Sequence, residues 1–174
     1  MEVRLVAIDD SARLSKFYEA NKTHLQAWEP SKSENHHSEA AWKARLQEWC
    51  SPIESASSFH FISIEPGSDE VVAVCSLTNV VKGPFRACYM GYAVDHRYEG
   101  KGVMKVLCQH VIDYAFTDLS LNRIMANYMP RNSRSAILLK RLGFIKEGEA
   151  KRYLKINGVW EDHILTSLLN PAST

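Results

Sequence analysis

The chain has 174 residues, of which 45% are hydrophobic and 24% charged, and its formal net charge is +1. A length in this range favours one globular domain, and the balanced charge gives no overall field that would attract nucleic acid or an anionic membrane surface. The sequence opens without a charged-then-apolar leader and has no apolar run near the roughly 18 residues of a membrane span, so we expect a soluble, cytoplasmic protein.

The first third of the sequence predicts a strand and two helices. Val3–Ile8 alternates apolar and polar residues and ends at two aspartates, which indicates a strand followed by a helix cap and a helix over Ser11–Asn21. Leu25–His37 contains a proline and many polar residues and is interpreted as a loop. Ser38 then caps a second helix, and Pro52 lies just past its end.

Three strand-like runs follow, and tight turns separate them. The runs are Phe59–Ile64, Glu70–Val81 and Ala87–Val94, with Pro-Gly-Ser-Asp and Lys-Gly-Pro between them. Strands joined by such short turns form an antiparallel meander.

The second half of the chain predicts helices alternating with strands, and then a hairpin. A helix over Val103–Phe116 and a strand over Arg123–Met129 come first, and a short helix over Asn132–Phe144 ends at its glycine. The last two strands, Ile145–Ile156 and Val159–Leu168, join at Asn-Gly, a strong hairpin signal. The order predicts one α/β domain built on a mixed sheet.

A glycine-rich loop, HRYEGKGV, lies where a predicted strand passes into a predicted helix. The N–H groups and the dipole at the start of that helix favour an anion, usually a phosphate. Gly100 and Gly102 have no side chains to hold a phosphate away, and Arg97 and Lys101 add charge. The loop lacks the P-loop motif, because valine follows Gly102, and the Rossmann pattern, because position 105 is lysine.

The pattern R-x-x-G-x-G over residues 97–102 resembles the pyrophosphate loop of the GCN5-related N-acetyltransferases (GNAT). Asn132, Ser135 and Leu142-Gly143-Phe144 follow it in the family's order. WEP at 28–30, RIMANYMPRN at 123–132 and INGVWEDHILTSL at 156–168 are similar to the RimJ/RimL-type ribosomal-protein-alanine N-acetyltransferases, especially the RimJ type. The resemblance implies one GNAT domain over 1–174, with a mixed, mostly antiparallel sheet whose fourth and fifth strands splay apart.

The same resemblance implies the reaction and its partners. Acetyl-CoA is the co-substrate, no metal takes part, and the acceptor is the N-terminal α-amine, on alanine, of a ribosomal protein. An α-amine, with a pKa near 7.7–8.0, costs only about 1 kcal/mol to deprotonate at pH 7, against roughly 4–5 kcal/mol for a lysine side chain. Such an acceptor therefore needs little help from a base. No nucleic-acid readout and no membrane contact are expected, and the oligomeric state stays open.

The resemblance also assigns roles to residues. A bulge at Gly91 would separate the strands, Ser135 would donate a proton to the leaving sulfur, and Glu29 of WEP would act on the amine through water. Tyr128 and Tyr153 compete with Ser135 as proton donors. The residues implied in cofactor binding are Tyr92, Ala93, Val94, Arg97, Tyr98, Glu99, Gly100, Lys101, Gly102, Val103 and Asn132.

Each role has a structural alternative that the sequence leaves open. Asn132 suits a helix N-cap, Ser135 can be a small residue that permits close packing, and Glu29 can be a solvated loop carboxylate. Glu147 and Glu161 are other candidate bases. Trp42 and Trp49, seven apart on one helical face, favour core packing over a peptide groove.

Two remaining groups of residues favour structural interpretations. The adjacent His36 and His37 point in divergent directions, so we expect no metal there. The cysteines form no C-x-x-C pair, which predicts free, mostly buried thiols. They are Cys50, Cys75, Cys88 and Cys108.

Two other functions remain open at this stage. The enzyme's acceptor can instead be a small amine, such as a polyamine, an amino acid or an aminoglycoside. The chain can also be a non-catalytic protein that binds coenzyme A or the ribosome as an assembly factor. The cofactor half is common to these alternatives, so the acceptor side must distinguish them.

Overall fold

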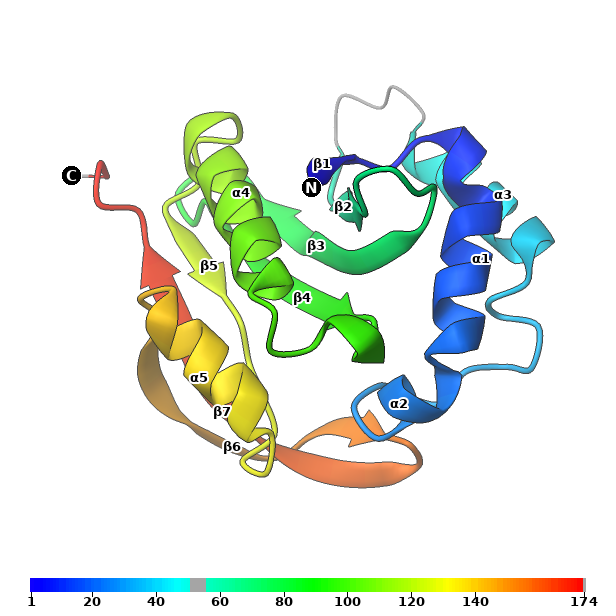
Figure 1. The fold of residues 1–174 in the computed structure, drawn as a ribbon. Coiled ribbons are helices and arrows are strands. Elements are labelled where there is room, and N and C mark those ends of the chain that lie inside the picture. The colour runs from blue at the N-terminus through cyan, green and yellow to red at the C-terminus, as the bar shows by residue number, and fades with distance from the viewer. Residues whose placement is uncertain (51–55, 174) are drawn as a thin grey trace.

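One mixed sheet organises the molecule, which is described by a computed structural model over residues 1–50 and 56–173. Within these residues seven strands lie in the order β1-β2-β3-β4-β5-β7-β6, and every neighbouring pair is antiparallel except the parallel pair β4 and β5 (Figure 1). The strands are β1 Glu2–Leu5, β2 Phe59–Ile64, β3 Val71–Val81, β4 Ala87–Val94, β5 Arg123–Met125, β6 Ile145–Ile156 and β7 Val159–Leu169.

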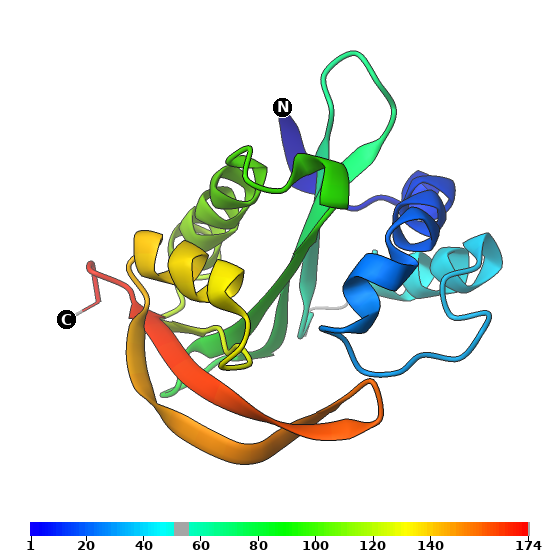
Figure 2. The same ribbon diagram turned by 60° about the horizontal axis from the view of Figure 1, so that its bottom comes forward.

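Helices cover both faces of this sheet. They are α1 Ser11–Ala20, α2 Lys22–Gln26, α3 Glu39–Trp49, α4 Val103–Thr117 and α5 Ser133–Arg141, with 3₁₀ turns at Ile8–Asp10 and His96–Tyr98. The helices α1 to α3 lie to one side of the central strands, and α4 and α5 lie to the other (Figures 1 and 2). In the described part of the chain, no helix is long and apolar enough to cross a membrane.

The core is divided by the sheet into two clusters. Alternate side chains of a strand point to opposite faces, so β2 and β3 contribute to both clusters. Leu107 of α4 is fully buried, and truncation to alanine is expected to cost about 2–5 kcal/mol. The α4 and α5 cluster includes Phe61, Ala73, Cys75, Leu77, Val111, Ile124 and Leu139; the α1 and α3 cluster includes Leu14, Phe17, Leu25, Trp42, Leu46 and Ile62.

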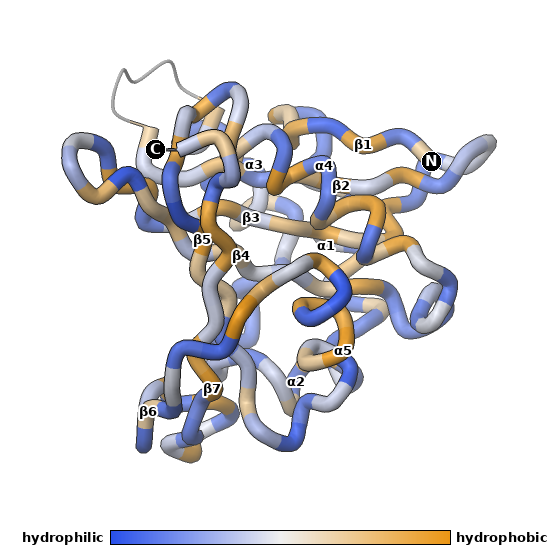
Figure 3. Tube along the Cα trace, turned by 90° about the vertical axis from the view of Figure 1, so that its left-hand side faces the viewer, coloured by the Kyte–Doolittle hydropathy of each residue, from blue (hydrophilic) through white to orange (hydrophobic). Residues whose placement is uncertain are grey.

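The hydropathy of the strands changes across the sheet. Hydrophobic residues concentrate on the central strands, whereas much of the β6–β7 hairpin is hydrophilic (Figure 3). This hairpin turns through Asn157 and Gly158, both at positive φ of 44° and 83°, as the sequence predicts. Apolar residues flank this turn, since Ile156 is buried whereas Val159 and Trp160 are exposed.

The predicted splay between β4 and β5 is confirmed, but its cause differs from the prediction. Pairing between the two strands covers only three positions and ends at Tyr89 and Met125. The strand predicted over Arg123–Met129 is too long, because after Met125 the backbone turns to β7 and Ala126 N–H donates to Thr166 O. From Met90 onward, the described strand pairings of β4 are with β3 alone.

The predicted bulge at Gly91 is wrong. The register between β3 and β4 is continuous through Ser76 and Gly91, and the irregularity lies further along, between Thr78 and Val81. The early end of β5 alone therefore separates the strands, so no distortion of β4 is needed.

The helix boundaries give one further correction. Part of the loop predicted over Leu25–His37 belongs to α2, because Leu25 is buried in the core and its N–H donates to Asn21 O. Ser38 caps α3 as predicted, with its hydroxyl accepting from Ala41 N–H at 3.2 Å. Pro52, predicted to lie just past α3, is outside the described residues.

The aspartate before α1 does not cap that helix through its side chain. Asp10 is fully buried and accepts instead from Arg4 Nη1 and Nη2 at 2.7 and 2.8 Å, from Arg13 Nη1 at 2.9 Å and from Ala7 N–H at 2.8 Å. Burial pushes the pKa of Asp10 upward, but these hydrogen bonds outweigh it and hold the pKa below its ordinary value. Asp10 thus joins β1 to α1.

Two predictions about packing are confirmed. Trp42 is buried in the core, where Tyr18 stacks on it with ring centroids 5.1 Å apart. The four cysteines are free, and all except the exposed Cys50 are buried.

Candidate functional site

The glycine loop joins the free part of β4 to α4 and is built to receive an anion. Gly100 and Gly102 have φ of 71° and 79°, in the left-handed region that favours glycine. A Cβ added at either would meet nothing within 4 Å, so the loop surface is open. The first turn of a helix leaves N–H groups without intrahelical partners, and the first bond of α4 runs from Val106 N–H to Gly102 O. The predicted diphosphate fits this arrangement.

The Arg97 side chain was predicted to add positive charge for an anion at the loop, but the structure shows it bound to carboxylates. Its N–H and Nε both donate to Asp95 Oδ1, at 2.8 and 3.0 Å, and its Nη2 contacts Glu70 at 3.2 Å. Arg97 is therefore held by carboxylates rather than free at the rim of the loop. Lys101 is exposed, with its Nζ 5.0 Å from the centre of the Tyr98 ring.

Glu99 brings a negative charge close to the open glycines, and two basic residues face it. Its carboxylate accepts from Arg134 of α5 and lies 3.2 Å from His24 Nε2 of α2. The Arg134 guanidinium offsets the charge that would otherwise repel an anion. Glu99 thus links the loop to helices on both sides of it.

Two hydroxyl groups lie close together beside the opening between β4 and β5, on the face of the sheet that α4 and α5 cover. The Tyr92 hydroxyl on β4 donates to Ser135 Oγ on α5 at 3.2 Å. Burial raises the pKa of Tyr92, so this phenol stays protonated and can donate. The alternative role of Asn132 as an N-cap is confirmed, because its Oδ1 accepts from Ser135 N–H at 3.1 Å. The cap fixes the turn that carries Ser135.

Polar residues line the other face of the sheet beside the same opening. His60, Ser76 and Gly91 are register partners on β2, β3 and β4, so they share the face that α1 and α3 cover in part. Gly91 is exposed and Ser76 is half-buried. The polar surface on this face and the hydroxyl pair on the opposite face therefore both include the part of β4 that β5 does not pair with.

The WEP segment is held in place by contacts with distant parts of the chain. Glu29 O accepts from Asn157 N–H at 3.1 Å, so the segment contacts the tip of the β6–β7 hairpin (Figure 2). Arg131 fastens it further, with Nη2 3.3 Å from Ala27 O and 3.0 Å from Glu161 Oε1, and its guanidinium 5.0 Å from the Trp28 ring. The WEP segment, Arg131 and the β6–β7 hairpin, which are distant in sequence, thus form one surface, called the acceptor wall below.

The carboxylates proposed as bases differ in how they are engaged. Burial raises the pKa of the half-buried Glu29 above its ordinary value, as suits a group that accepts a proton near neutral pH. Glu147 accepts two hydrogen bonds from Arg123, at 2.7 and 2.8 Å, which bring its pKa to about 2. Glu161 is paired with Arg131. Glu29 is thus the best placed of the three.

The competing tyrosine donors lie toward β7. Asn127 Nδ2 donates to the Tyr153 hydroxyl at 3.1 Å, while its Oδ1 accepts from Thr166 N–H at 3.2 Å. Tyr128 forms an isolated bridge with Ile164 of β7. Neither tyrosine has a recorded contact with Ser135, whereas Tyr92 does.

Sequence reasoning missed several residues that shape the site. The hydroxyl role of Tyr92 was not predicted, because the resemblance implied only backbone contacts along that strand. Asn21 and Asp95, both buried beside the loop, were missed because each has an ordinary position at the end of an element. Within the part of the chain that the structure describes, no three His, Cys, Asp or Glu side chains converge where a metal ion could bind.

Comparison with known proteins agrees with this geometry. Residues 1–145 match the family model described as acetyltransferase (GNAT) domain. The chain is 44% identical over 169 residues to [Ribosomal protein uS5]-alanine N-acetyltransferase of Escherichia coli strain K12, covering 97% of this chain and 87% of that protein.

Two solved structures are also similar. The ribosomal-protein-S5-alanine acetyltransferase from Vibrio fischeri has a TM-score of 0.95 and 40% identity, covering 99% of this chain and 94% of that chain. Mycobacterium smegmatis RimJ in complex with CoA-disulfide has a TM-score of 0.88 and 29% identity, covering 96% and 80%. The family match, the identity over nearly the whole chain and the split sheet with its glycine loop agree, and the chain belongs to the GNAT family of acetyltransferases.

Proposed function

We propose that this chain transfers an acetyl group from acetyl-CoA to the N-terminal α-amine of a ribosomal protein that begins with alanine, and that residues 1–174 act as one catalytic domain. The observation that carries the proposal is the opening between β4 and β5. It has the Tyr92 and Ser135 hydroxyl pair on one face. On the other face, the half-buried Glu29 is in electrostatic reach of Tyr18, which lines a cavity together with His60 and Ser76. The E. coli relative, named for ribosomal protein uS5, supports the choice of acceptor.

The backbone of the loop supplies most of the proposed cofactor site. The N–H groups of Gly100, Lys101, Gly102 and Val103 bind the diphosphate, and the Lys101 ammonium adds charge. The unpaired edge of β4 over Tyr92–Val94 binds the pantetheine arm by strand-like hydrogen bonds. The predicted contacts of Tyr98, Glu99 and Asn132 remain part of this proposal.

Arg97 takes a different part from the one the sequence suggested. Because its guanidinium and its N–H are bonded to Asp95, it maintains the shape of the loop and leaves the diphosphate to the glycine amides. A side chain engaged in this way contributes through geometry rather than through direct contact with the ligand.

The reaction requires that one proton is donated to the leaving sulfur and that one proton is removed from the acceptor nitrogen. Acetyl-CoA supplies the thioester; the acceptor nitrogen bonds to the carbonyl carbon while the carbon–sulfur bond breaks and its electron pair stays on sulfur. Ser135 protonates the sulfur and receives a proton from the Tyr92 hydroxyl, which already donates to Ser135 Oγ, and Tyr92 then regains a proton from water. The proton that leaves the nitrogen and the proton that returns to Tyr92 both pass through water, so the step balances.

Glu29 receives the amine proton through water. An α-amine needs only about 1 kcal/mol to reach its neutral form at pH 7, so a carboxylate that acts through water suffices. The raised pKa of Glu29 brings its basicity closer to that of the amine, which favours the transfer.

The proposed partner also fixes where the enzyme acts. An acceptor on a ribosomal protein places the reaction in the cytoplasm, on the free protein or on the assembled ribosomal subunit. The amino terminus of uS5 is the first acceptor to test, because the E. coli relative is named for that protein.

The test is a competition among acceptors. The protein is incubated with acetyl-CoA and an alanine-starting peptide that contains one internal lysine, the same peptide with a blocked amino terminus, or spermidine. Mass spectrometry should show one acetyl group, on the α-amine of the open peptide, with little transfer to the other two. Faster acetylation of spermidine would favour the small-amine alternative. Coenzyme A binding without transfer to any acceptor would favour the non-catalytic one.

A further inference from the structure

A buried pair of polar side chains joins the start of the glycine loop to the corner between α1 and α2. Asn21 is 0% exposed and Asp95 is 1% exposed. Asn21 Nδ2 donates to Phe17 O at 2.9 Å and to Asp95 Oδ2 at 3.2 Å, and Asn21 Oδ1 accepts from His96 N–H at 3.0 Å. One amide thus binds the end of α1 and two consecutive residues that lead into the loop.

The carboxylate of Asp95 is fully used by this arrangement. Its Oδ1 accepts from the N–H and Nε of Arg97, and its Oδ2 accepts from Arg97 Nη2 at 2.9 Å and from Asn21. Burial pushes the pKa of Asp95 upward, but these hydrogen bonds outweigh it and bring the pKa to about 2. Asp95 is therefore ionised at neutral pH, yet its charge is enclosed rather than presented to an anion.

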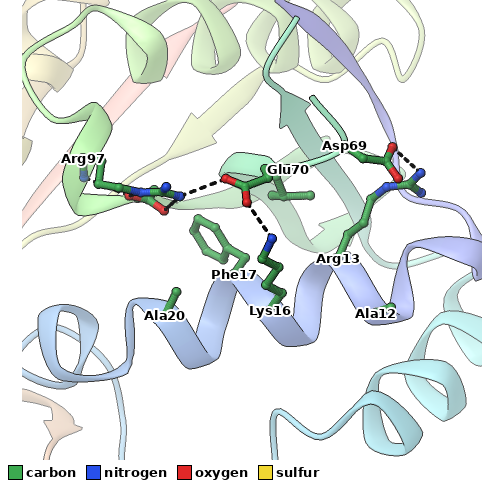
Figure 4. Close-up of a pocket in the computed structure, with 10 residues that line it drawn as sticks. Ala12, Arg13, Lys16, Phe17, Ala20, Asp69, Glu70 and Arg97 are labelled. Carbon is green, nitrogen blue, oxygen red and sulfur yellow. Dashed lines mark hydrogen bonds and ion pairs between the residues drawn. The ribbon is translucent and has the colours of Figure 1, made fainter. Parts of the chain in front are cut away.

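A second connection reinforces the first from the other side of Arg97. Arg97 Nη2 lies 3.2 Å from Glu70 Oε2, and Glu70 Oε1 accepts from Lys16 Nζ of α1 at 2.6 Å. These residues border a cavity of about 240 Å³ between α1 and the start of β3, which Figure 4 shows in close-up. The beginning of the loop is thus connected to α1 through Lys16 as well as to the residue that follows α1, Asn21.

The loop has a physical need for such support. Two glycines at positive φ give the loop backbone the freedom to depart from the anion-binding shape, and fixing that shape costs conformational entropy. Groups that fix the loop before the ligand arrives reduce that cost at the moment of binding. The buried pair acts on Asp95, which precedes the 3₁₀ turn, and on His96, the first residue of that turn.

We infer that Asn21 and Asp95 are positioning residues that hold the loop ready for the diphosphate of the cofactor. The inference rests on the proposed function, because it takes the diphosphate to be the anion at the loop. Neither residue contacts the ligand; Asp95 acts through Arg97 and the loop backbone, and Asn21 acts through Asp95 and His96. Their loss should therefore weaken coenzyme A binding and leave kcat at saturating substrates little changed.

The molecule contains a matched control at the other end of α1. Asp10 is also a fully buried carboxylate held by arginines, but its contacts join β1 to α1 and involve no residue of the loop. Asp10→Asn should lower the melting temperature, as Asp95→Asn does, without changing coenzyme A affinity. If Asp95→Asn does not fold, the Asn21→Ala variant still tests the inference.

The experiment is calorimetric titration of coenzyme A and of pantetheine, which lacks the diphosphate, into the wild type and the three variants. Asp95→Asn and Asn21→Ala should weaken coenzyme A at least about tenfold and leave pantetheine within about twofold, whereas Asp10→Asn should change neither. Equal coenzyme A affinity in all folded variants, or an equal loss in Asp10→Asn, would overturn the inference. Absence of coenzyme A binding by the wild type would instead contradict the proposed function, so the two failures are distinguishable.

Discussion

The cofactor side and the acceptor side of the opening are built in different ways. The cofactor side uses consecutive backbone: the free edge of β4, two glycines at positive φ and the first turn of α4. The acceptor side uses contacts between segments far apart in the chain, such as Glu29 with Asn157 and Arg131 with Glu161. In the proposed function, the cofactor shared by the family is bound by a local motif, whereas the acceptor is recognised by an assembly of tertiary contacts.

The largest effect is expected from a substitution that distorts the backbone of the glycine loop on the cofactor side. Gly102→Val places a β-branched side chain at a φ of 79° and disturbs the amides that face the diphosphate. Strain of roughly 1–2 kcal/mol and the loss of a charged hydrogen bond worth about 1.5–3 kcal/mol should lower kcat/KM for acetyl-CoA about 100-fold. Initial rates across acetyl-CoA concentrations measure this effect.

The β2–β3 turn provides the control for that variant. Gly67 has a φ of 77° and, like Gly102, an added Cβ there would meet nothing within 4 Å. Gly67→Val should impose similar strain and a similar loss of melting temperature with unchanged KM for acetyl-CoA. An equal KM defect in both variants would show that strain in general, and not the loop, affects the cofactor.

The second prediction concerns the hydroxyl pair on the cofactor side. Ser135→Ala removes the proposed proton donor and should lower kcat roughly 10- to 100-fold, with acetyl-CoA affinity little changed. Tyr92→Phe removes only the group that resupplies the proton, so its effect should be smaller. A larger kcat loss in Tyr92→Phe than in Ser135→Ala would reverse the two roles.

The third prediction tests the acceptor side through pH. Glu29 works as a carboxylate, so activity should fall as pH decreases through its raised pKa, and the raised pKa moves this fall toward neutral pH. Glu29→Gln should lower kcat/KM for the peptide about tenfold and remove that acidic limb. Glu34→Gln, at an exposed position in the same segment, serves as the control. An acidic limb that persists unchanged in Glu29→Gln would assign it to another group.

The smallest predicted effect is at the tertiary contacts of the acceptor wall. Arg131 is half-exposed and joins Glu161 to the WEP segment, and exposed pairs contribute only about 0.2–1 kcal/mol. Arg131→Ala should therefore raise KM for the peptide about threefold while KM for acetyl-CoA stays constant. A change in KM for acetyl-CoA with no change in KM for the peptide would show that Arg131 acts on the cofactor side instead.

The same contrast explains what the sequence could predict. The α/β fold, the glycine loop and the Asn157-Gly158 hairpin were predicted, because each depends on a local pattern of residues. Helix α2 was missed, because it is short and depends on burial of Leu25. The bulge at Gly91 was predicted wrongly, because the splay comes from the early end of a different strand.

The residues that position the site were the least predictable part. Asn21 and Asp95 lie 74 positions apart, and neither belongs to a motif that would associate them. The contact between Tyr92 and Ser135 spans 43 positions and depends on how α5 packs beside β4. Spacing along the chain cannot reveal such contacts, since they arise only once the sheet has formed.

The central claim is tested most directly by a crystal structure of the protein with coenzyme A. The account predicts the diphosphate within hydrogen-bond distance of the N–H groups of residues 100–103, and the thiol beside Ser135 in the gap between β4 and β5. A diphosphate bound elsewhere on the surface, or a thiol that lies outside the gap, would contradict it.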